Sequence, residues 1–216
     1  MPSKFVIRSF SENSYYHIFN RGVEKRNIFE DKQDYQIFKY YLFIYLLPLE
    51  TVLAKYPQLP LRLQARNLNG QVDLIAYCLM PNHFHLLLKQ ANKDSISRFM
   101  KQLTNAHTEY FNKKYHRDGG LVQGRFKAAL INSEPLLLHI SRYIHLNPLV
   151  AKLINNLQDY PWSSYLDYFS DSKYSLCKTE IILQQFSSKD TYKQFILDQI
   201  EYAKELNKIK HLTVDE

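Results

Sequence analysis

Residues 72–90, VDLIAYCLMPNHFHLLLKQ, contain two apolar runs on either side of a short turn at residues 80–82. Apolar runs of this length, separated by Pro and Asn, are typical of two antiparallel strands joined by a tight turn. Alternate side chains of a strand point to the same face, so His83 and His85 should lie side by side, with Phe84 on the opposite face. The two imidazoles would be close enough to bind one metal ion, but a histidine pair alone is weak evidence for a site.

Two other segments predict further strands. Branched and aromatic side chains are enriched over residues 14–22, and Gly22 ends that run. Residues 121–131 also read as a strand, with a bend expected at Gly124. The stretch 49–71 has mixed character and includes a loop.

Helical spacing of apolar residues predicts three long helices. They are expected over about 31–48, 95–115 and 134–146, the last one ended by Asn147-Pro148. Two amphipathic stretches predict further helices over about 179–210.

Strands and helices do not alternate strictly, which favours an α+β fold: an antiparallel sheet with helices packed on it. We expect a core domain over residues 1–150. An aromatic loop and a helical C-terminal region would follow over 151–216.

Composition excludes several classes of protein. The longest apolar stretch, residues 40–49, contains Pro48 and is too short to cross a bilayer. The first residues have no apolar signal core, so nothing argues for export. Cys78 and Cys177 form no disulfide framework or metal knuckle, and reduced thiols in the cytoplasm are the default interpretation.

The net charge of +7 is concentrated in the middle of the chain. Residues 89–127 hold nine basic and three acidic side chains, whereas residues 151–216 hold eight lysines and ten acidic residues. A basic middle beside a mildly acidic tail fits a face that binds a polyanion, although a basic surface without a partner is equally compatible with charge alone.

The expected helix at 134–146 supplies candidate partners for the histidines. Tyr143 and Asn147 are four residues apart and share a helix face with Leu136 and Ile140, so we expect that face to point toward the sheet. His145 lies about 200° away around the helix and should not join them. A tyrosine on an apolar face is commonly part of the core, and Asn before Pro is a common helix end. The spacing permits a site without establishing one.

Chemically, these side chains suit a metal-dependent reaction on a phosphodiester. An amide oxygen is a suitable ligand for Mg²⁺ or Mn²⁺, and imidazole suits Mn²⁺. Two imidazoles and one amide oxygen would leave positions open for phosphate oxygens and water, so that the ion acts as a Lewis acid. A tyrosine can then form a covalent intermediate.

Five motifs carry a resemblance to a known family, and their order and spacing match as well. The sequence resembles the HUH-type tyrosine transposases, in particular the REP-associated tyrosine transposases and the single-strand transposases of insertion sequences. The resemblance covers roughly residues 14–165. The matching segments are YHIFNRGVEKRNIF (16–29), AYCLMPNHFHLLL (76–88), LVQGRFK (121–127), SRYIHLNPLVAKL (141–153) and YPWSSY (160–165).

This resemblance implies a ferredoxin-like core and a set of roles. His83 and His85 become ligands of Mg²⁺ or Mn²⁺, with Asn147 as the third ligand, and Tyr143 becomes the catalytic nucleophile. The family cuts single-stranded DNA during transposition and recombination, leaving a 5′-phosphotyrosine and a free 3′-OH that can rejoin strands. No ATP is needed, and the sequence contains no GxxxxGK[ST] phosphate-binding motif.

The same resemblance suggests residues that bind DNA. Asn20, Arg21, Arg125 and Lys127 are the candidates, and such contacts give affinity rather than sequence choice. Each residue taken singly is also compatible with an ordinary surface charge.

We therefore expect a metal-dependent endonuclease and strand transferase that acts on single-stranded, hairpin or palindromic DNA in the cytoplasm, in association with the nucleoid. Two alternatives stay open: a domesticated DNA-binding protein that has lost transposition, and a phosphodiesterase that uses water as the nucleophile. Relatives include dimers and monomers, so a homodimer is neither required nor excluded.

Overall fold

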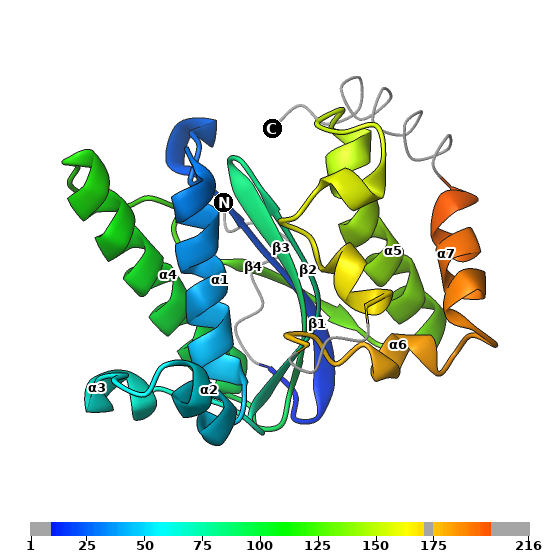
Figure 1. The fold of residues 1–216 in the computed structure, drawn as a ribbon, viewed down its shortest axis with the longest axis horizontal. Helices are drawn as coiled ribbons and strands as arrows, with labels where there is room; N and C mark the ends of the chain where they lie inside the picture. The colour runs from blue at the N-terminus through cyan, green and yellow to red at the C-terminus, as the bar shows by residue number, and fades with distance from the viewer. Residues whose placement is uncertain (1–9, 171–174, 200–216) are drawn as a thin grey trace.

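The computed structural model describes residues 10–170 and 175–199. Its centre is a four-stranded antiparallel sheet with strand order β2-β3-β1-β4 (Figure 1). The strands are β1 (Ser14–Arg21), β2 (Val72–Met80), β3 (His83–Gln90) and β4 (Lys127–Ile131). The predicted α+β fold, a ferredoxin-like antiparallel sheet with helices packed on it, is confirmed.

Helices cover both faces of the sheet. In Figure 1, α1 (Lys32–Leu46) and α4 (Ser95–Tyr115) lie on one side, and α5 (Glu134–Val150) lies on the other. The short helices α2 (Leu49–Lys55) and α3 (Leu61–Gln64) connect α1 to β2. Beyond α5 the chain forms α6 (Glu180–Leu183) and α7 (Lys189–Leu197), and the single-turn helices are η1 (Val23–Lys25), η2 (Leu157–Asp159) and η3 (Ser164–Tyr168).

The β2-β3 hairpin separates two hydrophobic cores by simple alternation. Tyr77 and Phe84 pack into the core beneath α1 and α4, whereas Cys78 and Leu87 pack into the core beneath α5. Both strands are therefore apolar on both faces, which explains why their sequence reads as continuous apolar runs. The face covered by α5 is also the face that carries the two histidines of β3, because Leu87 and His85 are two residues apart.

Most helices and strands begin and end near the capping and turn residues in the sequence. Asp31 caps α1 through a capping box with Asp34, and β2 and β3 are joined by Pro81 and Asn82 alone. The fourth strand is shorter than expected and covers only Lys127–Ile131. Before it, Gly124 has a φ of +54°, a conformation that side chains rarely adopt, so the chain bends there as predicted.

Helix α5 does not end at Asn147-Pro148, as the sequence suggests, but continues to Val150. Pro148 lies in the last turn, where its missing N–H removes a single hydrogen bond. The turn is otherwise closed, since the Ala151 N–H donates to the Asn147 carbonyl oxygen at 2.9 Å. The helix therefore tolerates proline at its end.

The second core extends beyond residue 150. Tyr165, Tyr168 and Tyr192 share one buried cluster with Ile144 and Leu149 of α5. Part of the expected helical region over 179–210 is present as α6 and α7, while residues 200–216 lie outside the described residues. The boundary between residues 150 and 151 stays a prediction. Within the described ranges, no helix has the length and apolar character needed to span a bilayer.

Candidate active site

The two histidines lie at the start of β3, directly after the turn that joins it to β2. Their ring centroids are 5.0 Å apart, with the rings at 88° to each other. His85 is only 6% exposed, and His83 is half-buried. The alternation of side chains along the strand places both on the face that α5 covers, as the sequence predicts.

Tyr143 of α5 lies against this histidine pair. The centroid of its ring is 5.4 Å from that of His85, at an angle of 81°. The Tyr143 side chain is nevertheless 40% exposed, so a bound molecule can reach it. The structure thus brings His83, His85 and Tyr143 to one place at the surface.

The orientation of α5 differs from the expectation in one respect. The helix buries Leu137, Ser141 and Ile144, whereas Leu136 and Tyr143 are among the exposed large hydrophobic residues. A helix turns by about 100° per residue, so the inward stripe lies next to the predicted one rather than on it. Tyr143 therefore sits at the rim of the contact between α5 and the sheet, not beneath it.

His145 points away from this site, as expected. It is fully buried, with Nε2 2.9 Å from the Ser164 hydroxyl and Nδ1 3.0 Å from the Tyr192 hydroxyl. Burial lowers the pKa of His145 to about 3, so the ring is neutral. Its role is to connect α5 with η3 and α7.

Asn147 lies one helical turn after Tyr143. Its Nδ2 donates a hydrogen bond to the Tyr143 backbone carbonyl at 2.8 Å. Burial raises the pKa of the Tyr143 phenol, and a hydrogen bond with the Asn147 side chain opposes that shift only in part. The phenol is therefore protonated at neutral pH and must lose its proton when it reacts.

The electronic state of His83 suits a metal ligand. Burial lowers its pKa to about 4, helped by the positive charge of Arg21, so the ring is neutral at pH 7. Its Nδ1 is 2.7 Å from Asn82 Oδ1. Because an amide oxygen only accepts, Nδ1 must donate, which leaves the lone pair on Nε2 for an ion.

Sequence reasoning missed a third histidine. His17 of β1 is 8% exposed, its Nε2 is 2.9 Å from His85 Nδ1, and its ring centroid is 5.8 Å from that of Tyr143. Burial lowers its pKa to about 4. The signal was present in the strand predicted over residues 14–22, but only the order of the strands shows that β1 lies beside β3.

Two of the four predicted DNA-binding residues lie on the histidine face of the sheet. Arg21 is paired with His83 across β1 and β3, and Lys127 is paired with Phe19, the partner of His85. Paired residues of antiparallel strands point to the same side, so both cations flank the site.

The other two lie on the α4 side. Asn20 is buried and its Nδ2 donates to the Gly124 carbonyl oxygen at 3.3 Å, which ties β1 to the loop before β4. Arg125 is exposed and donates to the Ser97 hydroxyl at 3.4 Å. Together with Lys101 they line a cavity of about 330 Å³.

The residues present are chemically compatible with a divalent ion. The described residues contain no group of three or more His, Cys, Asp or Glu side chains arranged for a metal. A site made of His83, His85 and an Asn147 oxygen would need no such group. Neutral ligands leave the charge of the ion uncompensated, which favours phosphate oxygens in the remaining positions.

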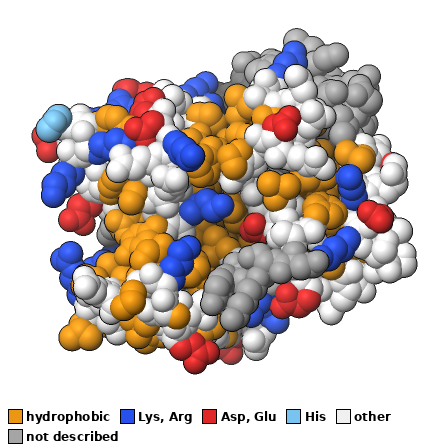
Figure 2. Space-filling view, viewed as in Figure 1, with side chains coloured by type: hydrophobic (Ala, Val, Ile, Leu, Met, Phe, Trp, Pro, Cys, Tyr) orange, Lys and Arg blue, Asp and Glu red, His pale blue; other side chains and the backbone are white. Residues whose placement is uncertain are grey.

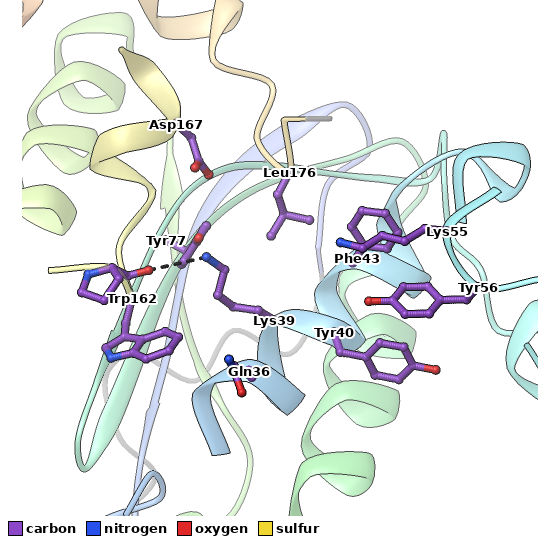
Figure 3. A pocket seen from close by; sticks show the side chains of 11 residues that line it. Gln36, Lys39, Tyr40, Phe43, Lys55, Tyr56, Tyr77, Trp162, Asp167 and Leu176 are labelled. Carbon is purple, nitrogen blue, oxygen red and sulfur yellow. Dashed lines mark hydrogen bonds between the residues drawn. The ribbon is translucent and has the colours of Figure 1, made fainter. Parts of the chain in front are cut away.

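A large pocket lies elsewhere. It has a volume of about 670 Å³ and is lined by α1 residues such as Lys39, by Tyr56, and by Trp162 (Figure 3). Figure 2, drawn in the same view as Figure 1, shows apolar side chains in the middle of the face turned to the reader, with lysines and arginines among them. None of the predicted site residues lines this pocket, so we do not assign the chemistry to it.

Comparisons with known proteins identify the same family as the motifs do. The family model of IS200-like transposases matches residues 61–147. A candidate REP-associated tyrosine transposase from Haemophilus influenzae is 27% identical over 103 residues, which cover 43% of this chain and 58% of that protein. The match thus spans less than two thirds of the relative's length.

One solved structure supports the fold. A REP-associated tyrosine transposase bound to a REP hairpin superposes with a TM-score of 0.53 at 15% identity, over 81% of this chain and 90% of the other. A candidate transposase from Deinococcus radiodurans gives a TM-score of 0.36 at 17% identity, over 67% and 95% of the two chains. The resemblance predicted from the motifs is confirmed by the family model and the Haemophilus influenzae relative.

Proposed function

We propose that this chain, of which residues 61–147 match the family model of IS200-like transposases, cuts and rejoins single-stranded or hairpin DNA with Tyr143 as the nucleophile. The proposal rests chiefly on one observation. The Tyr143 ring is in contact distance of His85, 5.4 Å between centroids, while 40% of the tyrosine side chain is open to a substrate. A tyrosine used only for packing has no need of both features.

In the proposed reaction, the Tyr143 oxygen attacks the phosphorus of a phosphodiester. The bond from phosphorus to the 3′ oxygen breaks, and the downstream strand stays attached to the enzyme as a 5′-phosphotyrosine. The phenol gives up its proton and the departing oxygen takes one up, which leaves a free 3′-OH. Attack by a second 3′-OH on the phosphotyrosine rejoins the strands, and no ATP is consumed.

His83, His85 and Asn147 would hold Mg²⁺ or Mn²⁺. Such an ion would supply Lewis-acid polarisation of the scissile phosphate. The protein's own contribution is positional: the start of β3 holds the imidazoles rigidly, and α5 holds the phenol beside them. Orientation of this kind can account for a large part of a rate enhancement.

Arg21 and Lys127 are proposed to bind the DNA backbone next to the reacting phosphate, because they share the face of the histidines. Arg125 would bind it at the β4 edge, near the α4 side. For Asn20 we propose an indirect role, since its amide holds the loop that carries Arg125.

The test is incubation with a labelled oligonucleotide that contains a hairpin and a single-stranded flank, with Mg²⁺ or Mn²⁺, followed by a denaturing gel. A covalent protein–DNA adduct is expected, and it should be absent in Tyr143→Phe and in His83→Ala. Tyr41→Phe, which changes a half-buried tyrosine of α1, is the matched control and should retain the adduct.

Other outcomes point to the alternatives. An adduct that survives in Tyr143→Phe would place the nucleophile elsewhere. Cleavage without an adduct would indicate a phosphodiesterase that uses water, and binding without cleavage would indicate a domesticated DNA-binding protein.

A further inference from the structure

We propose that His17 is a positioning residue: its Nε2 accepts a hydrogen bond from His85 Nδ1–H and thereby holds His85 in the tautomer that presents Nε2 to the metal ion. The inference rests on the proposed metal site. It adds a residue of β1 to a site whose proposed ligands and nucleophile lie on β3 and α5.

The geometry of the pair is well defined. His17 Nε2 and His85 Nδ1 are 2.9 Å apart, and the two rings are stacked with centroids 5.1 Å apart and 24° between their planes. Both side chains are more than nine-tenths buried. The contact is produced by the central position of β1 in the sheet, which pairs Phe19 with His85 and sets His17 one position further along the same face.

Only one direction of this hydrogen bond is compatible with a metal at His85. A neutral imidazole carries one N–H and one lone pair. If His17 donated, the lone pair of His85 would be on Nδ1 and its proton on Nε2, and no ring nitrogen could then face an ion. If His85 donates from Nδ1, its lone pair is on Nε2. His17 must then be the acceptor, with its own proton on Nδ1.

His83 has the same arrangement with a different partner. Its Nδ1 is 2.7 Å from Asn82 Oδ1, an atom that can only accept. Each candidate ligand therefore has its Nδ1 engaged by a neighbouring acceptor. Metal-binding histidines usually have such a partner on the second ring nitrogen, and it fixes both the tautomer and the ring orientation.

The competing explanation is that His17 only fills space. Its ring also stacks on Phe19 at 5.0 Å and meets the edge of Tyr143 at 5.8 Å. A ring of similar size without nitrogen would satisfy the packing but not the hydrogen bond. This difference separates the two explanations.

The first experiment measures Mn²⁺ binding by the full chain without DNA, from the free Mn²⁺ signal in electron paramagnetic resonance. His17→Phe keeps a ring and removes the acceptor, and we expect it to weaken binding by about 10- to 100-fold. His17→Gln, whose side-chain oxygen can reach the position of Nε2, should stay much closer to wild type. Thermal unfolding without metal reports whether each variant is folded.

Unchanged Mn²⁺ binding in a folded His17→Phe would overturn the inference and leave the proposed function intact. Absence of binding in the wild type and in His83→Ala alike would overturn the metal site itself, and the inference with it.

A second measurement needs no variant. Nitrogen-15 NMR of the histidine rings in the wild-type protein with Mg²⁺ should show His17 protonated at Nδ1 and His85 protonated at Nδ1. A proton on His17 Nε2 would contradict the proposal even if His17→Phe could not be folded.

Discussion

Asn147 Nδ2 donates to the backbone carbonyl of Tyr143 at 2.8 Å, one turn along α5, so the amide is anchored to the helix that carries the proposed nucleophile. With its nitrogen engaged, the atom left to approach an ion is Oδ1. A ligand fixed in this way moves together with Tyr143, which would keep the distance between the phenol and the ion constant.

The first prediction is that Asn147→Leu weakens Mn²⁺ binding by about tenfold and slows adduct formation, because it removes an oxygen ligand at similar size. Titration with Mn²⁺ and the rate of adduct formation at saturating Mn²⁺ measure the two effects. Asn156→Leu, an exposed asparagine beyond α5, is the control. If Asn147→Leu changes only the rate and not the affinity, the asparagine acts on the tyrosine and not on the ion.

The second prediction concerns Lys127, on the histidine face at the β4 edge. If Lys127 contacts one phosphate, Lys127→Ala should weaken binding of all DNA sequences alike and reduce the slope of log affinity against log salt by about 0.7 to 0.9. Fluorescence anisotropy with two unrelated hairpins at several salt concentrations measures this. Lys32→Ala, an exposed lysine at the start of α1, should leave the slope unchanged. A loss confined to one sequence would mean that Lys127 reads a base.

The third prediction concerns the contact between α1 and α4. Asp34 is completely buried and accepts hydrogen bonds from Lys114 at 2.8 Å, Tyr110 at 2.9 Å and Tyr115 at 2.8 Å. Asp34→Ala leaves these donors without their shared acceptor, and breaking a buried ion pair costs about 3 to 5 kcal/mol. Urea unfolding should show a loss of this size.

Asp94→Ala is the control for this measurement, because the Asp94 carboxylate is exposed and its ion pair with Arg98 spans 3.9 Å. Its effect should be small, since exposed ion pairs contribute about 0 to 1 kcal/mol. Equal losses in the two variants would show that the Asp34 network contributes no more than an exposed ion pair.

Much of the site follows from local periodicity. Alternation along β3 places His83 and His85 on one face, and helical spacing places Asn147 one turn after Tyr143. Both patterns depend only on neighbours in the chain, and the structure shows both. The match of helices and strands to the expected segments has the same origin, because caps such as Asp31 act within one turn.

Three features were not accessible in this way, and the first two depend on packing between distant segments. The position of His17 against His85 depends on β1 lying between β3 and β4. The exposure of Tyr143 depends on how α5 rotates to bury Leu137 and Ile144 instead. The continuation of α5 past Pro148 to Val150 is possible because a proline in the last turn removes only one hydrogen bond of the helix.

The last prediction is a loss of stability in mild acid caused by His107 of α4. Its ring is buried, and Nε2 lies 2.8 Å from the Ile28 carbonyl oxygen, which can only accept. Burial lowers the pKa of His107 from 6.5 to about 4, although the hydrogen bond to Ile28 works in the opposite direction. Between pH 6.5 and pH 4, His107 is protonated in the unfolded chain but stays neutral in the folded protein. The free energy of unfolding therefore falls as the pH falls through this range.

Each pKa unit corresponds to about 1.4 kcal/mol, so His107 should remove roughly 3 kcal/mol between pH 7 and pH 4. Urea unfolding at a series of pH values measures the loss. His107→Gln keeps a donor for the Ile28 carbonyl but does not titrate, and its stability should decline less steeply over this range than that of the wild type. The exposed His116, changed to Asn, is the control and should leave the slope as it is in the wild type. Parallel curves for wild type and His107→Gln would mean that the ring is protonated as easily inside the fold as outside it, contrary to its burial.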